Sequence, residues 1–275
     1  MTEITVYPVF TDLNGIGPDP DLSPLPVVAR VGRYSKHWQV ETHAHQRGQL
    51  MFVTSGSMRV QTRDGSWITP PGRACWIPSA AMHSVTYTQM SEMQTVLISP
   101  KWLDTLPTRC CVIKLTPLLR ELVSQAVAIN NQYSLDGPEH RLMRVLVDQI
   151  SIAQQAPLFL PEGRDQRLRR VTERLHQNPG DNRNIEEWSQ LAGASTRTLA
   201  RLFQKETGMT FSAWRQQLCL IRAVEMLIEG ASVTNIALAL GYESTAGFTS
   251  MFSRSMGESP SNYLTRWSQD KPASQ

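Results

Sequence analysis

The chain carries one pattern twice: Leu191-Ala192-Gly193-Ala194-Ser195 with Leu199, Phe203 and Gly208, and, 49 residues later, Leu240-Gly241-Tyr242-Glu243-Ser244 with Phe248, Phe252 and Gly257. Each copy predicts a helix, a turn at small residues and a second helix opened by a serine cap. Chance rarely repeats one offset at five aligned positions. The two copies therefore predict a tandem helix-turn-helix, an arrangement typical of proteins that read DNA.

In the first copy, Asn184 and Glu187 have the spacing of a capping box. Leu199 and Phe203 face inward, so the second helix presents its remaining residues outward. The residues expected at DNA are Ser195, Thr196, Arg197, Thr198, Ala200, Arg201 and Lys205. We expect the two arginines to contact bases, because a guanidinium can bond both acceptors of guanine. Thr198 and Lys205 are better placed for phosphates.

The second copy offers shorter side chains to DNA. The residues expected there are Ser244, Thr245, Ala246, Thr249, Ser250 and Arg254. The first arginine in this set comes late in the helix, so hydroxyl, methyl and phosphate contacts are expected. We therefore expect the first copy to carry most of the base specificity.

From about residue 164 to 267 the chain resembles the DNA-binding domain of AraC/XylS-type transcription regulators. The matching positions are Ile236-Ala237, Leu240 to Ser244, Phe248, Phe252, Gly257, Pro260 and Tyr263, with Leu199, Arg201, Leu202, Phe203 and Thr207-Gly208 in the first copy. The resemblance implies that both recognition helices enter successive major grooves on one face of DNA. It implies base readers at Arg197, Ala200, Arg201, Thr245, Ala246, Thr249 and Ser250. Members often carry long polar or basic side chains where this chain has Ala200 and Ser250.

The N-terminal half has a different character. Residues 1–26 contain five prolines and predict a loosely attached arm. Short apolar runs separated by turn residues follow, at 50–53, 58–62, 75–78, 85–87 and 95–98, and predict a compact β-barrel or sandwich. The expected fold is α+β: a cupin-like sensor barrel (27–110), a helical pair (111–155), a linker (156–163), an all-α tandem helix-turn-helix domain (164–267) and a tail (268–275).

The helical pair is predicted from caps and spacing. Thr116-Pro117 and Gly137-Pro138 each open a helix. The apolar stripes are Leu115, Leu118, Leu119, Leu122, Val123, Ala126 and Val127, then Leu142, Val145, Leu146, Ile150 and Ala153. Such stripes either pack into the core or form the seam of a homodimer, and the sequence leaves both interpretations open.

A histidine cluster is predicted in the barrel. His43 and His45 share a strand face, and Gln49 falls four residues further. The pattern His43-x-His45, Gln49, Gly56, Pro71-Gly72 and His83 resembles the cupin barrel, whose catalytic members usually have glutamate at the position of Gln49.

Three interpretations of this cluster remain: an effector pocket, a structural remnant, or a divalent metal site at His43, His45 and His83. Arg47 either meets an anionic effector or lies on the surface. Trp38, Phe52, Trp67 and Trp76 either line the barrel or pack in its core.

Composition sets limits on the class of protein. Hydrophobic residues make up 41% and charged residues 19%, as in soluble globular proteins. Residues 1–155 carry 13 Lys and Arg against 12 Asp and Glu, and residues 156–275 carry 14 against 12. Neither half is strongly basic, so the DNA interpretation depends on the motifs. No secretory signal or membrane span is visible, and the four cysteines form no C-x-x-C pair, so a cytoplasmic protein with reduced thiols is expected.

The favoured hypothesis is a sequence-specific transcription regulator that is not an enzyme. Its expected partners are double-stranded DNA, a small-molecule effector, a second copy of the chain and, if it activates, RNA polymerase; no resident cofactor and no membrane are expected. The alternative is a metal-dependent cupin enzyme with a DNA-binding tail. The sequence names neither the effector nor the sign of regulation.

Overall fold

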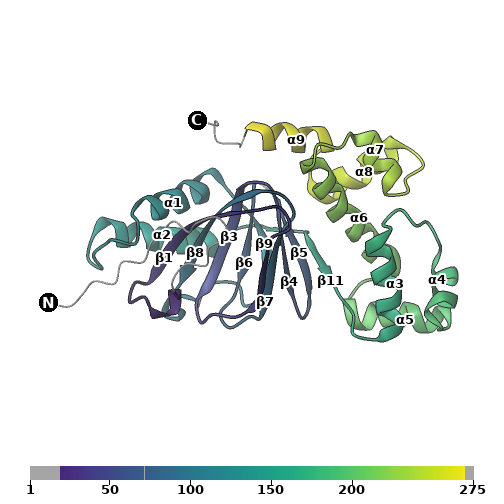
Figure 1. Ribbon diagram of the computed structural model, residues 1–275, viewed down its shortest axis with the longest axis horizontal. Helices are drawn as coiled ribbons and strands as arrows, with labels where there is room; N and C mark the ends of the chain where they lie inside the picture. The colour runs from purple at the N-terminus through teal and green to yellow at the C-terminus, as the bar shows by residue number, and fades with distance from the viewer. Residues whose placement is uncertain (1–18, 71, 270–275) are drawn as a thin grey trace. The chain divides into compact units, whose positions relative to one another are not determined.

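A computed structural model describes residues 19–70 and 72–269 (Figure 1). Most of the predicted arm, Pro71 of the cupin-like pattern and the last six residues of the predicted tail lie outside the described residues. The chain divides into an N-terminal unit, with residues up to 61 and 69–156, and a C-terminal unit, with residues 62–68 and 157–269.

The N-terminal unit is built of antiparallel strands. One sheet has the order β1-β8-β3-β6-β9-β10, and a second contains β4, β7 and β2 in that order. The strands are β1 (Val27–Tyr34), β2 (Gln39–His43), β3 (Gly48–Ser55), β4 (Met58–Thr62), β6 (Arg73–Ile77), β7 (His83–Tyr87), β8 (Ser91–Ile98), β9 (Cys111–Lys114) and β10 (Gln155–Ala156). Two short 3-10 helices are η1 (Pro20–Leu22) and η2 (Pro100–Trp102).

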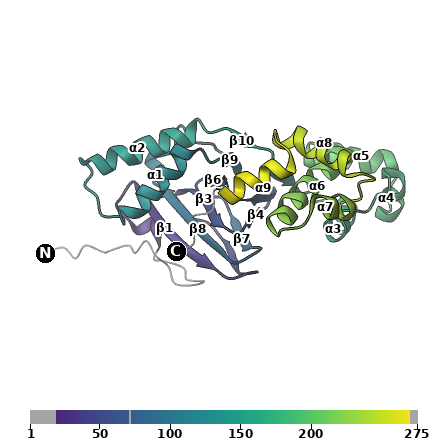
Figure 2. The same ribbon diagram turned by 90° about the horizontal axis from the view of Figure 1, so that it is seen from above.

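The helical pair is inserted between two strands. Thr116 caps α1 (Pro117–Ala128), and Gly137 precedes α2 (Pro138–Ser151). The expected range of 111–155 is too wide, because β9 and β10 pair with each other at its two ends. Figures 1 and 2 show both helices beside the sheet that contains β1 and β8.

The helices bury a stripe that differs in part from the predicted one. Leu119, Leu122, Val123 and Ala126 of α1 are buried, as expected. In α2, however, Val145 is exposed, whereas Met143 and Val147 join the core beside Leu146 and Ile150. Leu118 is exposed as well. The core of this unit therefore lies between the sheet and one face of the pair.

The C-terminal unit is mostly helical, so the predicted α+β fold class is confirmed. Its helices are α3 (Gln166–Gln177), α4 (Ile185–Ala192), α5 (Thr196–Thr207), α6 (Phe211–Ile228), α7 (Val233–Ala239), α8 (Thr245–Met256) and α9 (Pro260–Gln269). The segment expected as a linker is not irregular, because it holds β11 (Phe159–Pro161), which pairs with β5 (Gly65–Thr69).

Two expectations from composition can be compared with the structure. None of the four cysteines forms a disulfide. Burial raises the pKa of Cys75 and takes that of Cys111 to about 11, so both are protonated near neutral pH and are weak nucleophiles. No helix in the described ranges has both the length and the apolar character that crossing a bilayer requires.

Side chains of α6 fasten the segment of β11. The indole N–H of Trp214, which is fully buried, donates to the carbonyl of Pro161 at 2.7 Å. The amide of Gln217 donates to the carbonyl of Pro157 at 2.6 Å. This segment is thus part of the C-terminal unit. A domain boundary at residue 164 would separate the segment from the helix that holds it.

These contacts predict that a DNA-binding fragment of residues 157–275 is more stable than one of residues 164–275. Removing Pro161 leaves the buried indole N–H of Trp214 without its acceptor, which costs about 1–3 kcal/mol of unfolding free energy. Urea denaturation of the two fragments measures the difference. In a Trp214→Phe background, where no donor remains, the difference should shrink; equal midpoints for the unmodified fragments would contradict the assignment.

Candidate DNA-binding surface and effector cavity

The first helix-turn-helix forms as the sequence predicts. Asn184 and Glu187 make the reciprocal hydrogen bonds of a capping box at the start of α4. Gly193 ends that helix in the left-handed region at φ 69°, where other residues would be strained. The Ser195 side chain then accepts from the backbone N–H of Thr198 and opens α5. Local caps and one glycine therefore set the angle at which the second helix begins.

The outward face of α5 carries the predicted DNA residues. Ser195, Arg197, Ala200, Arg201 and Lys205 are exposed. Neither arginine forms an ion pair with a described residue, so both guanidinium groups are available. The two threonines are half-buried and make local contacts.

The Thr196 hydroxyl lies 3.2 Å from that of Ser189, and the Thr198 hydroxyl lies 2.9 Å from that of Ser195. In this structure the hydroxyls of Thr196 and Thr198 stabilise the turn between α4 and α5. Gln204, which the sequence analysis missed, is exposed on the same face and could have been found from its spacing of three and seven residues from Arg201 and Arg197.

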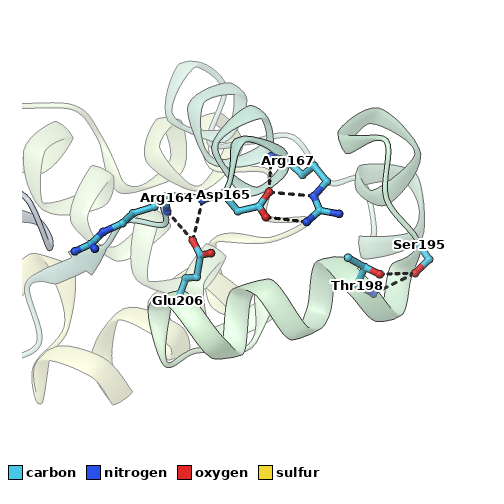
Figure 3. Close-up of polar contacts among 6 residues, drawn as sticks. All are labelled: Arg164, Asp165, Arg167, Ser195, Thr198 and Glu206. Atoms are coloured by element: carbon cyan, nitrogen blue, oxygen red, sulfur yellow. Dashed lines mark hydrogen bonds and ion pairs between the residues drawn. The ribbon is translucent and has the colours of Figure 1, made fainter.

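The opposite end of α5 is fixed to the start of α3, as Figure 3 shows. The Glu206 carboxylate accepts from the backbone N–H groups of Arg164 at 2.6 Å and Asp165 at 3.0 Å. The Arg167 guanidinium donates two hydrogen bonds to Asp165 and lowers the pKa of that carboxyl to about 2. The two bonds of Glu206 hold the recognition helix to the start of α3.

The second helix-turn-helix repeats the first with one local difference. Ser244 accepts from the N–H of Gly247 and opens α8, and Gly257 ends it, as Gly208 ends α5. The left-handed glycine of the turn is Gly241, one residue out of register with the 49-residue repeat from Gly193. The repeat therefore holds in the recognition helices and shifts at the turn.

The predicted DNA residues of α8 are only partly exposed. Ser244, Ala246, Ser250 and Arg254 are exposed, whereas Thr245 and Thr249 are half-buried. The face of α8 is consequently less polar than that of α5, as the sequence indicates.

Backbone contact between the two modules fixes their spacing. The Asn182 amide donates to the carbonyl of Gly241 at 2.8 Å, and Arg215 donates to the Asn182 carbonyl oxygen. A Cβ at Gly241 would lie 2.4 Å from the oxygen of Gly180, and one at Gly180 would lie 2.4 Å from that of Ala239. Only glycines allow this approach, which holds α4 and α7, and with them α5 and α8, in one rigid arrangement.

The N-terminal unit contains a cavity of about 380 Å³. One end is polar, with His43, His45, His83 and Gln49. The remaining wall carries the charged residues Asp19, Asp21 and Arg30 and is otherwise largely apolar and aromatic, with Val31, Tyr34, Val40, Met51, Val85, Tyr87, Met93 and Leu97. An apolar enclosure with a few convergent polar groups is the usual form of a small-molecule site.

The structure brings the predicted histidines together, but not through the shared strand face that the sequence predicts. β2 ends at His43, which pairs with His83 across β2 and β7, and the chain leaves the strand before His45. Gln49 lies on β3 in the other sheet, so a shared strand face is the wrong explanation. A tight loop between β2 and β3 instead places His45 Nε2 2.9 Å from Gln49 Oε1.

The three rings lie within contact of one another. Ring centroids are 4.3 Å apart for His43 and His83, 5.2 Å for His45 and His83, and 6.0 Å for His43 and His45. One ring nitrogen from each residue lies within 4.8 Å of the others, a spacing that a metal ion could bridge. Burial lowers the pKa of His83 to about 4, and the neighbouring imidazoles contribute in the same direction. His83 is therefore neutral near pH 7.

Arg47, expected at the effector, lies elsewhere. Its buried guanidinium donates to the carbonyls of Ser23 at 2.6 Å and Leu25 at 2.9 Å. It does not line the cavity. The segment before β1, expected to be loosely attached, is held by this arginine because a buried guanidinium needs acceptors.

The tryptophans and Phe52 do not line the cavity either. Phe52 and Trp76 belong to the core beneath the helical pair, Trp67 stacks on Phe159, and Trp38 is partly exposed. Apart from the three histidines and Gln49, the residues that do line it were missed. Their signal was the spacing of two along each strand: Met51 with Gln49 on β3, Val85 and Tyr87 with His83 on β7, and Met93, Thr95 and Leu97 on β8.

The lowered pKa of His83 predicts a pH dependence of stability. The unfolded chain takes up this proton near pH 6.5, whereas the folded protein does so only near 4. Between these values the unfolded state binds more protons, so the contribution of His83 is complete above about pH 6.5 and is lost as the pH falls. In chelator-treated buffer the urea midpoint of the wild type should fall more steeply from pH 7 to 4.5 than that of His83→Asn. The exposed control His37→Asn should follow the wild type; equal slopes for wild type and His83→Asn would contradict the cause given.

Comparison with known proteins covers both units. A family model described as the AraC-like ligand binding domain matches residues 26–146, and a helix-turn-helix domain model matches residues 188–266. The HTH-type transcriptional regulator NimR of Escherichia coli (strain K12) is 34% identical over 232 residues, which cover 84% of this chain and 85% of NimR.

A more distant relative is the HTH-type transcriptional activator RhaR of Yersinia pestis bv. Antiqua (strain Angola), 24% identical over 270 residues, with 87% of this chain and 89% of RhaR covered. Among solved structures, ToxT from Vibrio cholerae aligns with a TM-score of 0.37 at 12% identity, covering 88% of this chain and 98% of ToxT. The matches to both domain families and the similarity to NimR over most of both chains identify the family of this protein. The chain belongs to the AraC family of transcription regulators, with an N-terminal ligand-binding domain and a C-terminal helix-turn-helix DNA-binding domain.

Proposed function

We propose that a small molecule bound in the cavity of the N-terminal unit controls this regulator. The observation that carries the proposal is the cavity itself: about 380 Å³, partly open, with a largely apolar wall and imidazole and amide groups at one end. This volume lies in the range of about 300–1,000 Å³ that is usual for small-molecule sites. His43, His45, Gln49 and His83 would orient the effector by hydrogen bonds.

Control follows if the effector prefers one of two states of the protein. A ligand shifts an equilibrium only by its difference in affinity for the two states. The effector must therefore bind more tightly to the state in which α5 and α8 are placed to bind DNA, or to the state in which they are not. In the first case the effector promotes DNA binding. In the second case it promotes release from DNA.

We infer that α5 supplies most of the base readout. Arg197 and Arg201 are exposed, four residues apart and free of ion pairs among the described residues, so each is available to a guanine edge. Ser195, Thr196, Thr198 and Lys205 would contact phosphates or support the turn. In α8, the exposed residues Ser244, Ala246, Ser250 and Arg254, with Thr245 and Thr249, would contribute methyl, hydroxyl and phosphate contacts.

We also infer that the chain works in the cytoplasm without catalysis. Among the described residues that line the cavity there is no serine, cysteine or lysine. The only aliphatic hydroxyl, that of Thr95, donates to the carbonyl of Leu50. The relatives in the comparison are regulators, which supports this inference over a metal-dependent cupin enzyme. RNA polymerase is a partner if the chain activates transcription.

Selection of genomic DNA fragments at physiological salt tests the proposal, because nonspecific phosphate binding is weak there. Full-length protein and the 157–275 fragment are compared. Enrichment of a motif with two blocks about 10 base pairs apart supports the reading by α5 and α8. Enrichment by the fragment alone indicates that the full chain requires its effector. If neither folded protein enriches a motif, the proposed DNA reading is wrong.

With the selected site in hand, Arg201→Ala should weaken binding by about 1–3 kcal/mol and relax preference at one or two base pairs. Lys205→Ala is the matched control: it removes a charge from the same exposed face but should weaken all sequences equally. Competition binding against single-base variants of the site gives both values. Unchanged selectivity in Arg201→Ala would remove that residue from the base readers.

The chain is proposed to act as a homodimer through the helical pair. Val145 of α2 and Ile152, the residue that caps the end of this helix, are 44% and 73% exposed and lie seven residues apart. Leu118 of α1 is 52% exposed. Aliphatic side chains left outside the core on both helices suit the self-complementary surface of a two-fold dimer.

A charge on this face should separate the protomers. Val145→Glu would bury an unpaired carboxylate in the dimer, so we expect it to raise the dimer dissociation constant at least tenfold. Gln132→Glu, which adds the same charge at an exposed position between α1 and α2, should leave it unchanged. Sedimentation velocity over a concentration series measures both constants, and a monomeric wild type would rule the dimer out.

A further inference from the structure

The hydrogen bonds of the three clustered histidines all have the same polarity. Nδ1 of His43 lies 2.8 Å from the carbonyl of Glu41, that of His45 lies 2.6 Å from the carbonyl of Arg47, and that of His83 lies 2.8 Å from the carbonyl of Ala81. A carbonyl oxygen can only accept, so Nδ1 carries the proton on every ring. An imidazole with a single proton, on Nδ1, has a lone pair on Nε2. A metal-binding histidine is usually oriented in this way, with its second nitrogen donating to a backbone carbonyl.

One of these lone pairs is buried without a partner. His83 is fully buried, and its Nε2 has no hydrogen-bond partner in the described part of the chain. An unsatisfied buried acceptor costs free energy unless a cation or a donor meets it. His83 Nε2 therefore indicates a cation or a hydrogen-bond donor at the centre of the cluster.

The Nε2 lone pair of His45 faces another hydrogen-bond acceptor, the side-chain oxygen of Gln49. The Thr95 hydroxyl donates to the carbonyl of Leu50, so its oxygen accepts from the Gln49 amide NH₂ at 3.1 Å. This bond fixes the amide and turns Gln49 Oε1 toward His45 Nε2, 2.9 Å away. Two acceptors at that distance repel each other. A cation bound to both would remove the conflict, since two ligands of one tetrahedral ion with bonds of about 2.0–2.2 Å lie about 3.4 Å apart, which needs only a small outward shift of Gln49 Oε1.

We propose that Nε2 of His43, His45 and His83, together with Oε1 of Gln49, bind one divalent transition-metal ion such as Zn²⁺. The ring nitrogens offered by the histidines already lie within 4.8 Å of one another, against about 3.4 Å in a tetrahedral zinc site. His43 and His45 are only half-buried, so their side chains can close this gap. Imidazole nitrogen favours zinc, copper, iron and nickel over magnesium or calcium.

The ligand set is neutral, which makes Gln49 the informative position. Three imidazoles and one amide contribute no negative charge as ligands of the ion. A carboxylate at position 49 would add charge attraction and a stronger ligand, so Gln49→Glu should raise affinity. If Gln49 only made hydrogen bonds to His45 and Thr95, the same change would break the bond to Thr95 and bring no gain. This inference does not depend on effector control, because it requires only the folded N-terminal unit.

The test uses full-length protein without a histidine tag, stripped with a chelator and titrated with Zn²⁺ by calorimetry and with Co²⁺ by absorption spectroscopy. We expect one ion per chain. His43→Ala and His45→Ala should each weaken binding by at least ~100-fold, more than the loss of an outer-shell partner. Gln49→Glu should strengthen binding by about tenfold, and His37→Asn, at an exposed histidine outside the cluster, should match the wild type.

Circular dichroism establishes that each variant is folded, which the partial exposure of His43 and His45 favours. A cobalt spectrum without a thiolate charge-transfer band excludes the four cysteines as ligands. The proposal is overturned if the folded wild type binds no ion stoichiometrically, or if the histidine variants bind as tightly as the wild type. A proton on His45 Nε2 would then be what relieves the contact with Gln49.

Discussion

Neighbouring side chains of a β-strand point to opposite faces of the sheet, and the N-terminal unit depends on this alternation. On β3, Leu50 and Phe52 pack beneath the helical pair while Gln49 and Met51 face the cavity. On β8, Val96 and Ile98 face the core while Thr95 and Leu97 face the cavity. A one-residue slip would exchange the two sets, so the apolar core and the ligand site are specified by the same register. The helices stabilise the sheet on one side and leave the other free to enclose a ligand.

In the C-terminal unit, the two helix-turn-helix modules depend on α6. It is buried on more than one side, through Trp214, Leu218, Ile221 and Val224 among others, because it contacts α5 of one module and α7 of the other. The glycine contact between residues 180 and 241 adds a second connection. Two recognition helices can read successive grooves only if their spacing is constant, and these contacts supply that rigidity. The same helix holds the β11 segment through Trp214 and Gln217, so the chain that enters this unit is fixed to it.

The polar end of the cavity combines two features that are usually separate. Its imidazoles are oriented by backbone carbonyls, which suits a metal ion, and they face a cavity with a largely apolar wall, which suits an organic effector. Arg47 has no part in either, because its guanidinium is used to hold residues 23–25. Charge recognition by an arginine at position 47 is therefore not available, and the charged groups that line the cavity are those of Asp19, Asp21 and Arg30.

The sequence by itself determined the tandem helix-turn-helix, the caps at Asn184, Ser195 and Ser244, the starts of α1 and α2, and the approximate course of most strands. These features are local: a cap, a glycine turn or a period of 3.6 residues depends on side chains only a few positions apart. The histidine cluster was also visible as a set of residue types, although the reason given for its assembly was wrong.

Only the tertiary structure decided which of two faces an apolar residue occupies, as with Val145 and Met143 in α2, or Phe52 and Met51 in β3. It also decided that Arg47 is buried, that residues 159–161 form a strand, and that His45 meets Gln49 across a loop. Each of these outcomes depends on a partner distant in the sequence, and pairwise contacts between distant segments leave no periodic signal in a single chain.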